Sequence, residues 1–420
     1  MNTGAEAGAF DVCVVGGAGH VGAPLAMVFA RHGFRTLIYD INKVALEKIA
    51  SGQLPFLEEG GPELLAEVLP TGRLGFSSDI KSVAGIPNVI LTIGTPIDEF
   101  HNPLVRVVDE CIDALSPHLT EGQLLILRST VFPGVTEHTH RYLSERMAHK
   151  ILLAFCPERV VQGYSIRELQ TLPQIVSGTS QEAEKRAAKL FSAIAPKIVH
   201  MVPIEAEFAK LFSNAYRYIQ FAATNQFYMM VEAAGLDYHR LLAGLKEDYP
   251  RMRDLPGPGL AAGPCLYKDT LQLAAFSSHQ FSLGYAAIQS NEGLPAFLLS
   301  QLEERYNLRE MTVGLLGMAF KKDSDDTRSS LSYKIKKLLR HKAKRVLTTD
   351  PFVTTDPELR PVDEVVAGSD VLVVCVPHTG YRQLDLTGKT VVDIWNLYAR
   401  VEGAGSIGPV AASTRTGSGG

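Results

Sequence analysis

One short segment of the chain combines a thiol, an amine and a carboxylate. Cys265 is followed by Lys268 and Asp269 at the end of a loop rich in proline and glycine, whereas the other four cysteines lie in or near apolar runs. The thiolate is the nucleophile of cysteine chemistry, and a nearby cation makes a thiolate easier to form. This segment therefore predicts covalent catalysis by Cys265, and a small buried side chain is the alternative.

A second group of polar residues lies on a segment that we expect to be one long helix. Glu207, Lys210 and Asn214 are spaced at i, i+3 and i+7, which places them on one helix face. The aromatic and aliphatic residues between them leave little of this segment plainly exposed. A functional face and a solvated polar stripe are the two interpretations.

The start of the chain contains the pattern of a dinucleotide-binding turn. Gly17, Gly19 and Gly22 form a Gly-x-Gly-x-x-Gly motif between a predicted strand and a predicted helix. Such glycines let the backbone turn tightly and approach a pyrophosphate at the helix N-terminus. Asp40 ends the next predicted strand, where a carboxylate binds the ribose hydroxyls of NAD and repels the 2′-phosphate of NADP. The pattern indicates NAD binding, and an ordinary turn with a surface aspartate is the alternative.

Three further predicted strands end in polar residues. Thr95 lies in a Gly-Thr-Pro loop, Thr130 in a Ser-Thr pair and Glu158 in a Cys-Pro-Glu-Arg segment. Ligands of a doubly wound sheet bind outside the carboxyl ends of its strands, so Thr95 could contact the nicotinamide half of the cofactor. Thr130 and Glu158 could meet in one crevice, as catalytic groups or as helix caps. Cys156 is expected to be a small buried side chain.

A charged run follows a predicted strand near residue 316. It contains Lys321, Lys322 and Arg328 among several aspartates. Charged loops are usually just solvated, but lysine and arginine after a strand end also suit a diphosphate.

The sequence pattern around these residues indicates an α/β fold. Up to residue 204, and again from residue 311, short apolar runs alternate with helical patterns, which is typical of parallel sheets with right-handed crossovers. Between them, residues 205–233 contain no glycine or proline and predict one helix of about 43 Å. The predicted strands are 11–15, 36–39, 89–93, 124–127, 151–155, 174–177, 312–316, 345–348, 371–376 and 390–394.

The fold class that follows is α/β, with two Rossmann-like, doubly wound domains joined by a central all-helical domain with one long connecting helix. The 420 residues suffice for two or three domains. We expect an N-terminal NAD-binding domain at 1–204, a central helical domain at 205–304, a C-terminal domain at 305–412 and a disordered tail at 413–420.

Composition excludes several classes of protein. The net charge of −4 argues against a partner made of nucleic acid, which usually needs a basic face. Five scattered cysteines argue against a disulfide framework and for a reducing compartment. We find neither a secretory segment nor an uncharged apolar stretch long enough for a membrane helix. The expectation is a cytoplasmic protein without a membrane partner.

The ordered motifs of the chain resemble those of the UDP-glucose/GDP-mannose dehydrogenase family of nucleotide-sugar 6-dehydrogenases. The resemblance covers nearly the whole chain, in the family's order. The matching segments are the glycine motif 17–22, Gly-Thr-Pro 94–96, Ser-Thr-Val-x-Pro-Gly 129–134, Pro-Glu 157–158, Lys210 with Asn214, Cys-x-x-Lys-Asp 265–269, and the run from Phe-Lys-Lys-Asp to Asp-Thr-Arg at 320–328. Seven motifs in order make the resemblance specific.

The resemblance implies an NAD-dependent, four-electron oxidation of the C6 hydroxyl of a nucleotide-diphosphate sugar to a uronic acid. Cys265 would add to the intermediate aldehyde, and oxidation of this thiohemiacetal would leave a thioester that water releases. Lys210 would stabilise oxyanions and Asn214 would hold the same oxygen or a water. Asp269 would assist water and proton handling.

The resemblance also implies binding roles and a homodimer formed through the long helix and the central domain. Thr130 and Glu158 would position the hydrolytic water or act as its base, and Lys321 and Arg328 would bind the diphosphate. The expected cofactor-binding residues are Gly17, Gly19, His20, Val21, Gly22, Asp40, Lys43 and Thr95. The other expected substrate-binding residues are Glu158, Arg159, Lys210, Asn214, Arg251 and Gly259. We expect no metal.

Departures from the family pattern leave the sugar open. The loop at 257–264 is one residue longer than usual, and alanines replace flexible glycines in it. The segment 156–160 resembles the N-acetylhexosamine branch, whereas 265–269 resembles the glucose branch, so UDP-glucose or a UDP-N-acetylhexosamine is expected. The alternatives are a one-step β-hydroxyacid-type dehydrogenase and a non-catalytic sensor of a nucleotide sugar or NAD.

Overall fold

The computed structural model describes residues 10–98, 104–398 and 406–410. The chain forms two compact units. The first contains Met1–Ser213 with Ala275–Ser277, and the second contains Asn214–Ala274 and the chain from Ser278 onward. The predicted tail at 413–420 lies outside the described residues, and the division into three domains stays a prediction.

The first unit is built on an eight-stranded sheet with the order β3-β2-β1-β4-β5-β6-β7-β8. The six strands from β3 to β6 follow the order of a Rossmann dinucleotide-binding sheet, and all are parallel. The strands are β1 (Val12–Val15), β2 (Thr36–Tyr39), β3 (Leu74–Ser77), β4 (Asn88–Leu91), β5 (Leu124–Leu127), β6 (Leu152–Phe155), β7 (Gln174–Gly178) and β8 (Ile198–His200).

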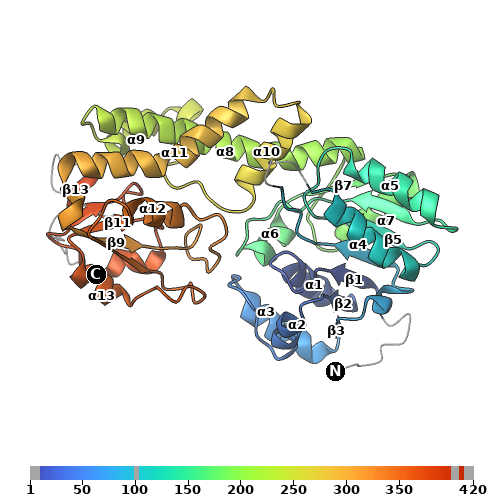
Figure 1. Cartoon of the computed structure of the whole chain (residues 1–420). Helices are drawn as coiled ribbons and strands as arrows, with labels where there is room; N and C mark the ends of the chain where they lie inside the picture. The colour runs from blue at the N-terminus through green and yellow to red at the C-terminus, as the bar shows by residue number, and fades with distance from the viewer. Residues whose placement is uncertain (1–9, 99–103, 399–405, 411–420) are drawn as a thin grey trace. The chain divides into compact units, whose positions relative to one another are not determined.

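Helices cover both faces of this sheet (Figure 1). Alternate residues of a strand face opposite sides, so Val12 and Val14 pack into one core, and Cys13 and Val15 into the other. The first core is covered by α1 (Gly22–Arg31), α2 (Lys43–Ala50), α3 (Gly61–Val68), α6 (Ser165–Thr171) and α7 (Gln181–Phe191). The second is covered by α4 (Arg106–Leu115) and α5 (Val135–Arg146).

The second unit contains a five-stranded sheet with the order β10-β9-β11-β12-β13. Its strands are β9 (Thr312–Leu316), β10 (Arg345–Thr349), β11 (Val371–Val374), β12 (Thr390–Val392) and β13 (Ile407–Pro409). One face packs against α11 (Ser282–Arg305) and α12 (Leu331–Leu339), and the other against α13 (Val362–Gly368). This sheet is therefore also covered on both sides, as predicted.

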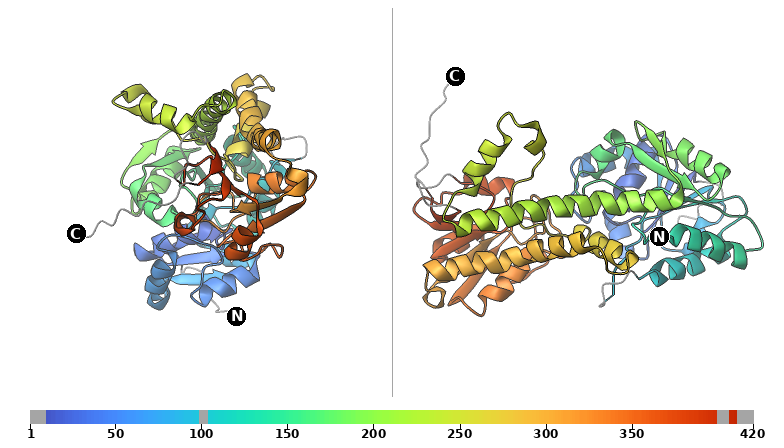
Figure 2. Two further views of the ribbon diagram at one scale, coloured as in Figure 1. Left: turned by 90° about the vertical axis from the view of Figure 1, so that its left-hand side faces the viewer. Right: turned by 90° about the horizontal axis from the view of Figure 1, so that it is seen from above.

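The long helix is present as α8 (Pro203–Ala233), which has 31 residues. It ends just before Gly235, whose φ of +72° suits glycine at a helix C-terminus. Within the second unit, α8 and α11 run side by side (Figure 2). Asn225 Nδ2 of α8 donates a hydrogen bond to Asn291 Oδ1 of α11, and Asn291 Nδ2 donates one to the carbonyl oxygen of Tyr218. The remaining helices here are α9 (Tyr238–Lys246) and α10 (Leu266–Phe276).

All ten predicted strands are present, with ends that differ from the expected ones by two residues or fewer. The edge strands β3, β8 and β13 were not expected, because they are short and do not read as buried apolar runs. In β3 only Leu74 is buried, and Gly75 sits against the ring of Phe10. The pairs β6–β7 and β12–β13 are antiparallel. Between the predicted strands β6 and β7, the expected parallel pairing is therefore wrong.

Short 3-10 helices complete the described chain: η1 (Leu69–Thr71), η2 (Ile80–Val83), η3 (Ser116–His118), η4 (Pro250–Met252), η5 (Leu308–Glu310) and η6 (Thr379–Gln383). Within the described ranges, none of the helices combines the length and apolarity needed to cross a membrane.

Candidate active site

The glycine motif forms the turn between β1 and α1. A Cβ atom on Gly22 would lie 2.6 Å from both the carbonyl oxygen of Gly16 and the Cα of Gly17, so this position accepts only glycine. On Gly19, by contrast, the nearest atom to a Cβ would be the Gly16 oxygen at 3.5 Å. Gly22 therefore closes the turn against the sheet, and Gly19 leaves room beside the backbone.

Asp40 is fixed beside this turn at the end of β2. Its Oδ2 accepts a hydrogen bond from the Ala18 N–H at 3.0 Å, and its Oδ1 accepts one from the Asn42 N–H at 2.9 Å. The carboxylate remains half-buried rather than covered. A bare turn at a helix N-terminus with a fixed carboxylate beside it fits the pyrophosphate and ribose of NAD. The ring centre of His20 lies 4.2 Å from that of Phe56, with the rings tilted by 37°, and Lys43 is exposed at the start of α2.

The loops that follow β4 and β5 are joined by side-chain hydrogen bonds. Thr95 Oγ1 donates to the carbonyl oxygen of Thr130 at 2.5 Å, and Ser129 Oγ donates to that of Ile93 at 2.6 Å. The structure thus places Thr95 beside Thr130 at the carboxyl edge of the sheet.

Glu158 follows β6 and is bound by a residue that the sequence analysis missed. Arg128, at the end of β5, is buried and forms an ion pair with the Glu158 carboxylate. Arg128 Nη1 also donates to the carbonyl oxygen of Cys156 at 3.1 Å and to Gln174 Oε1 at 3.0 Å. The other carboxylate oxygen of Glu158 accepts the N–H groups of Arg159 and Val160.

Cys156 and Arg159, which lie close to Glu158 in the sequence, have structural roles. Burial raises the pKa of the Cys156 thiol to about 12, so this cysteine is the small buried residue that we predicted. The guanidinium of Arg159 donates to the carbonyl oxygen of Pro173, and burial lowers its pKa. Arg159 is therefore held by the backbone of its own unit.

The polar residues of α8 are buried, so the alternative of a solvated stripe is wrong. Glu207 accepts hydrogen bonds from Gly134 N–H at 2.6 Å and from Thr136 N–H and Oγ1 at 2.8 and 2.6 Å. It thereby caps α5, and burial raises its pKa although these three bonds oppose the shift. Lys210 and Asn214 are 9% and 8% exposed.

Cys265 lies immediately before α10 in the second unit and is exposed, whereas Cys13, Cys156 and Cys375 are buried. Its carbonyl oxygen accepts the N–H of Asp269 at 2.9 Å, in the first turn of the helix. A helix N-terminus stabilises a nearby anion, which is the form in which a cysteine attacks carbon.

Asp269 is fully buried and is held by two side chains. Asn214 Nδ2 donates to its Oδ2 at 2.6 Å, and Lys268 Nζ lies 3.5 Å from its Oδ1. Asn214, Asp269 and Cys265 are thus joined through one hydrogen bond and one helical turn.

The loop before the cysteine, residues 257–264, is held at both ends. Asn225 of α8 exchanges two hydrogen bonds of 2.9 Å with the backbone of Gly259, and the Gly263 N–H donates to the carbonyl oxygen of Ser329. Ala261 and Ala262 are not among the described non-glycine residues with positive φ. The alanines therefore fit this loop without backbone strain.

Residues 317–330, which we call the β9 loop, carry the predicted diphosphate-binding cations. Arg328 is paired with Asp326 through Nε and Nη2, at 3.0 and 2.6 Å from Oδ2. The hydrogen bonds to Asp326 raise the pKa of Arg328. Lys321 is partly buried, with its Nζ 5.9 Å from the centre of the Phe320 ring.

Arg251 does not join this group. It is exposed on η4, and its guanidinium lies 3.3 Å from the hydroxyl of Tyr249. Within the part of the chain that the structure describes, no three histidine, cysteine, aspartate or glutamate side chains gather as metal ligands.

Sequence profiles match the chain in three consecutive blocks. The profiles of the UDP-glucose/GDP-mannose dehydrogenase family match residues 10–195 as its NAD binding domain, 204–293 as its central domain and 314–400 as its UDP binding domain. The chain belongs to this family. It is an NAD-dependent nucleotide-sugar dehydrogenase, and the β9 loop lies within its UDP binding domain.

Individual relatives of this dehydrogenase cover nearly all of it. UDP-N-acetyl-D-mannosamine dehydrogenase of Pyrococcus horikoshii is 30% identical over 380 residues, which are 88% of this chain and 90% of the relative. The solved structure of the UDP-D-ManNAc dehydrogenase from Pyrococcus horikoshii has a TM-score of 0.86 and 28% identity, covering 93% of this chain and 96% of that one. A UDP-glucose dehydrogenase from Pyrobaculum islandicum has a TM-score of 0.84 and 26% identity, covering 94% and 95%.

Proposed function

We propose that this dehydrogenase oxidises the C6 hydroxyl of a UDP-N-acetylhexosamine to a carboxylate in two steps, with Cys265 as the covalent nucleophile. The observation that carries the proposal is the exposed Cys265 at the N-terminus of α10, next to the buried Asn214–Asp269 pair. UDP-N-acetylmannosamine is the first substrate to test, because the relative with 30% identity carries that name. UDP-glucose is the second, since a structural neighbour is a UDP-glucose dehydrogenase.

The proposed reaction has two oxidation steps and one hydrolysis. When bound, NAD would accept one hydride in each oxidation step, and the hydroxyl proton lost in the same step would pass to a base or to solvent. After the first oxidation, the Cys265 thiolate forms a C–S bond with the C6 aldehyde, and the oxyanion takes a proton. Oxidation of this thiohemiacetal leaves a thioester. Water then forms a C–O bond to its carbonyl carbon and the C–S bond breaks, which releases a carboxylate, the thiolate and two protons. Two NAD are reduced for each sugar oxidised.

The buried polar groups suit the charges that arise at C6. Lys210 supplies a fixed positive charge for the oxyanion, and Asn214, one helical turn away on α8, supplies an amide N–H. Asp269 Oδ1 is ion-paired with Lys268 at 3.5 Å but accepts no hydrogen bond among the described residues, so it has capacity to receive a proton or to orient a water.

The test is the NADH yield per sugar under limiting substrate. We expect two NADH per sugar with UDP-N-acetylmannosamine, and UDP-N-acetylglucosamine, UDP-glucose and TDP-glucose are run in parallel. Cys265→Ser should trap or greatly slow the reaction, whereas Cys111→Ser, a control outside the proposed chemistry, should leave it unchanged. One NADH per sugar, or full uronate production by Cys265→Ala, would contradict the covalent mechanism. Sugar binding without any NADH would favour a sensor.

The exposed apolar side chains of α8 support the proposal of a homodimer. Tyr216, Phe227 and Met230 are 63%, 44% and 62% exposed. At about 100° per residue their spacing keeps them within a sector of roughly 60°. Such an uncovered stripe is typical of a protein interface. Sedimentation should show a dimer that Tyr216→Lys/Met230→Lys converts to a monomer, whereas Val44→Lys on α2 should remain dimeric.

A further inference from the structure

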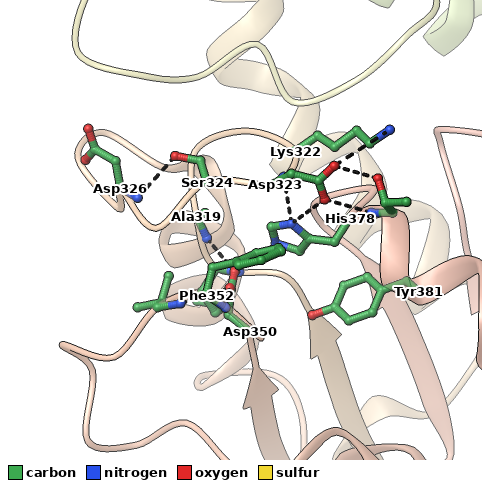
Figure 3. Close-up of polar contacts among 12 residues, drawn as sticks. Ala319, Lys322, Asp323, Ser324, Asp326, Asp350, Phe352, His378 and Tyr381 are labelled. Carbon is green, nitrogen blue, oxygen red and sulfur yellow. Dashed lines mark hydrogen bonds and ion pairs between the residues drawn. The ribbon is translucent and has the colours of Figure 1, made fainter. Parts of the chain in front are cut away.

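A buried histidine lies beneath the β9 loop (Figure 3). His378 follows β11 and is completely buried. Its Nδ1 accepts a hydrogen bond from the backbone N–H of Asp323 at 2.9 Å, and its Nε2 lies 3.0 Å from Asp350 Oδ2. A backbone N–H can only donate, so Nδ1 presents its lone pair and Nε2 carries the proton. The neutral imidazole therefore joins the loop to the end of β10.

Asp350 connects the histidine to the beginning of the same loop. Its Oδ2 also accepts the N–H groups of Met318 and Ala319 at 2.6 and 2.9 Å, and its Oδ1 accepts that of Phe352 at 2.8 Å. Through Asp350, His378 thus contacts the first residues after β9, and through Nδ1 it contacts the middle of the loop.

The residue after the histidine holds the other side of Asp323. The Asp323 carboxylate accepts hydrogen bonds from Thr379 N–H at 2.8 Å and from Thr379 Oγ1 at 2.5 Å. Asp323 has a φ of +51°, a conformation that non-glycine residues adopt rarely and that needs support from its surroundings. His378 and Thr379 supply that support. Asp323 is two residues from Lys321 and five from Arg328 in the sequence, so its conformation bears on both cations.

The first unit also has an aspartate at the end of its second strand, but that side chain is less buried. Asp40 also ends the second strand of its sheet and accepts an N–H from the turn after the first strand, but it stays partly accessible. The Asp350 side chain, by contrast, has no exposed surface, and the buried imidazole of His378 lies 3.0 Å from its Oδ2. In the UDP binding domain, the aspartate at the end of the second strand is therefore buried and stabilises the β9 loop through hydrogen bonds.

We propose that His378 is a positioning residue for nucleotide-sugar binding, which holds the β9 loop in the conformation that presents Lys321 and Arg328 to the diphosphate. The inference rests on the proposed role of these two cations. It adds a residue that touches neither the sugar nor the cofactor and acts through the backbone of Asp323.

Two substitutions of His378 test the roles of its two ring nitrogens separately. In His378→Asn the amide oxygen can take the place of Nδ1 and accept the Asp323 N–H, while the contact with Asp350 is lost. In His378→Gln the amide nitrogen can take the place of Nε2 and donate to Asp350, while the acceptor for Asp323 is lost. Each variant keeps one of the two buried hydrogen bonds and loses the other, so a destabilisation that comes only from losing a buried hydrogen bond would be similar in both.

Substrate kinetics and UDP binding by calorimetry provide the first readout. We expect His378→Gln to raise the KM for the nucleotide sugar and the Kd of UDP about tenfold, with kcat and the KM for NAD unchanged. His378→Asn should stay within about threefold of wild type. An equal loss in both variants, or unchanged UDP affinity in His378→Gln, overturns the proposal.

Amide hydrogen exchange of the peptide spanning 318–328, without ligand, provides the second readout. Exchange in this segment should accelerate about tenfold in His378→Gln and return close to wild type in His378→Asn. Equal exchange in the two variants also overturns the proposal. This measurement needs no substrate, so it remains decisive if wild-type protein fails to bind UDP, an outcome that would count against the proposed function instead.

Discussion

The carboxylate of Glu158 is paired with the buried guanidinium of Arg128, which joins the ends of β6 and β5. Both oxygens of Glu158 are occupied, one by Arg128 and the other by the N–H groups of Arg159 and Val160. Of the two roles expected for Glu158, this arrangement favours a fixed, orienting carboxylate over a base that takes up a proton.

Removing the arginine should leave this carboxylate without its main partner. Arg128→Met is expected to lower the free energy of unfolding of the first unit by about 3 kcal/mol, because breaking a buried ion pair leaves an uncompensated charge. Urea denaturation followed by circular dichroism measures the change. The double variant Arg128→Met/Glu158→Gln should recover part of the loss. If the two single effects simply add, the residues are not coupled and the prediction is wrong.

The glycine turn predicts different consequences for two of its glycines. Gly22→Ala places a Cβ 2.6 Å from two backbone atoms, so the first unit should lose thermal stability and NAD binding together. Gly19→Ala meets no atom closer than 3.5 Å, so the fold should persist while the Kd for NAD rises about tenfold or more. Thermal melting and NAD titration separate the two. Normal NAD affinity in a folded Gly19→Ala variant would remove the proposed cofactor contact.

The loop before Cys265 offers another matched pair of glycines. A Cβ on Gly259 would lie 2.1 Å from the Trp395 ring, whereas one on Gly257 meets nothing within 4 Å. Gly259→Ala should therefore displace the loop and lower kcat/KM for the nucleotide sugar at least tenfold, while Gly257→Ala stays within about twofold. Trp395→Leu in the Gly259→Ala background should restore part of the activity. Equal effects of the two alanines would show that the Trp395 contact does not fix the loop.

The fold could be predicted largely because its strands are short apolar runs covered on both faces. The edge strand β3 was missed, since only Leu74 in it is buried and it has a neighbour on one side only. The direction of a strand could not be predicted either. The sequence of β7 resembles that of its neighbours, but β7 pairs antiparallel with β6. An apolar run specifies that a strand is buried and not which way it is oriented.

Residue types that do chemistry could be predicted, but the groups that hold them could not. Arg128 directly follows an apolar strand, and a charge at the end of a buried run was the available signal for the Glu158 partner. Asn225 and His378 gave no such signal, because their partners, Gly259 and Asp323, lie 34 and 55 residues away in the sequence. Such contacts depend on tertiary packing, which spacing along one helix or strand does not show.

Asp350 predicts how the second unit responds to acid. Burial alone would raise the pKa of Asp350, but the hydrogen bond from His378 and the backbone N–H groups of Phe352 and Ala319 outweigh it, so the pKa lies below its usual value. A carboxyl whose pKa is lowered by folding stabilises the fold above the unfolded-state pKa of about 3.9. That contribution is lost as the pH falls through the lower, folded-state pKa.

Asp350→Asn should therefore be less stable than wild type at pH 7, and the difference should shrink as the pH falls from about 5 toward 3. The fluorescence of Trp395, the single tryptophan of the chain, reports unfolding of the second unit directly. Asp363→Asn, at an exposed position in the first turn of α13, should change stability little at any of these pH values. A stability difference for Asp350→Asn that stays constant with pH would mean that the ionised carboxylate is not what anchors the loop.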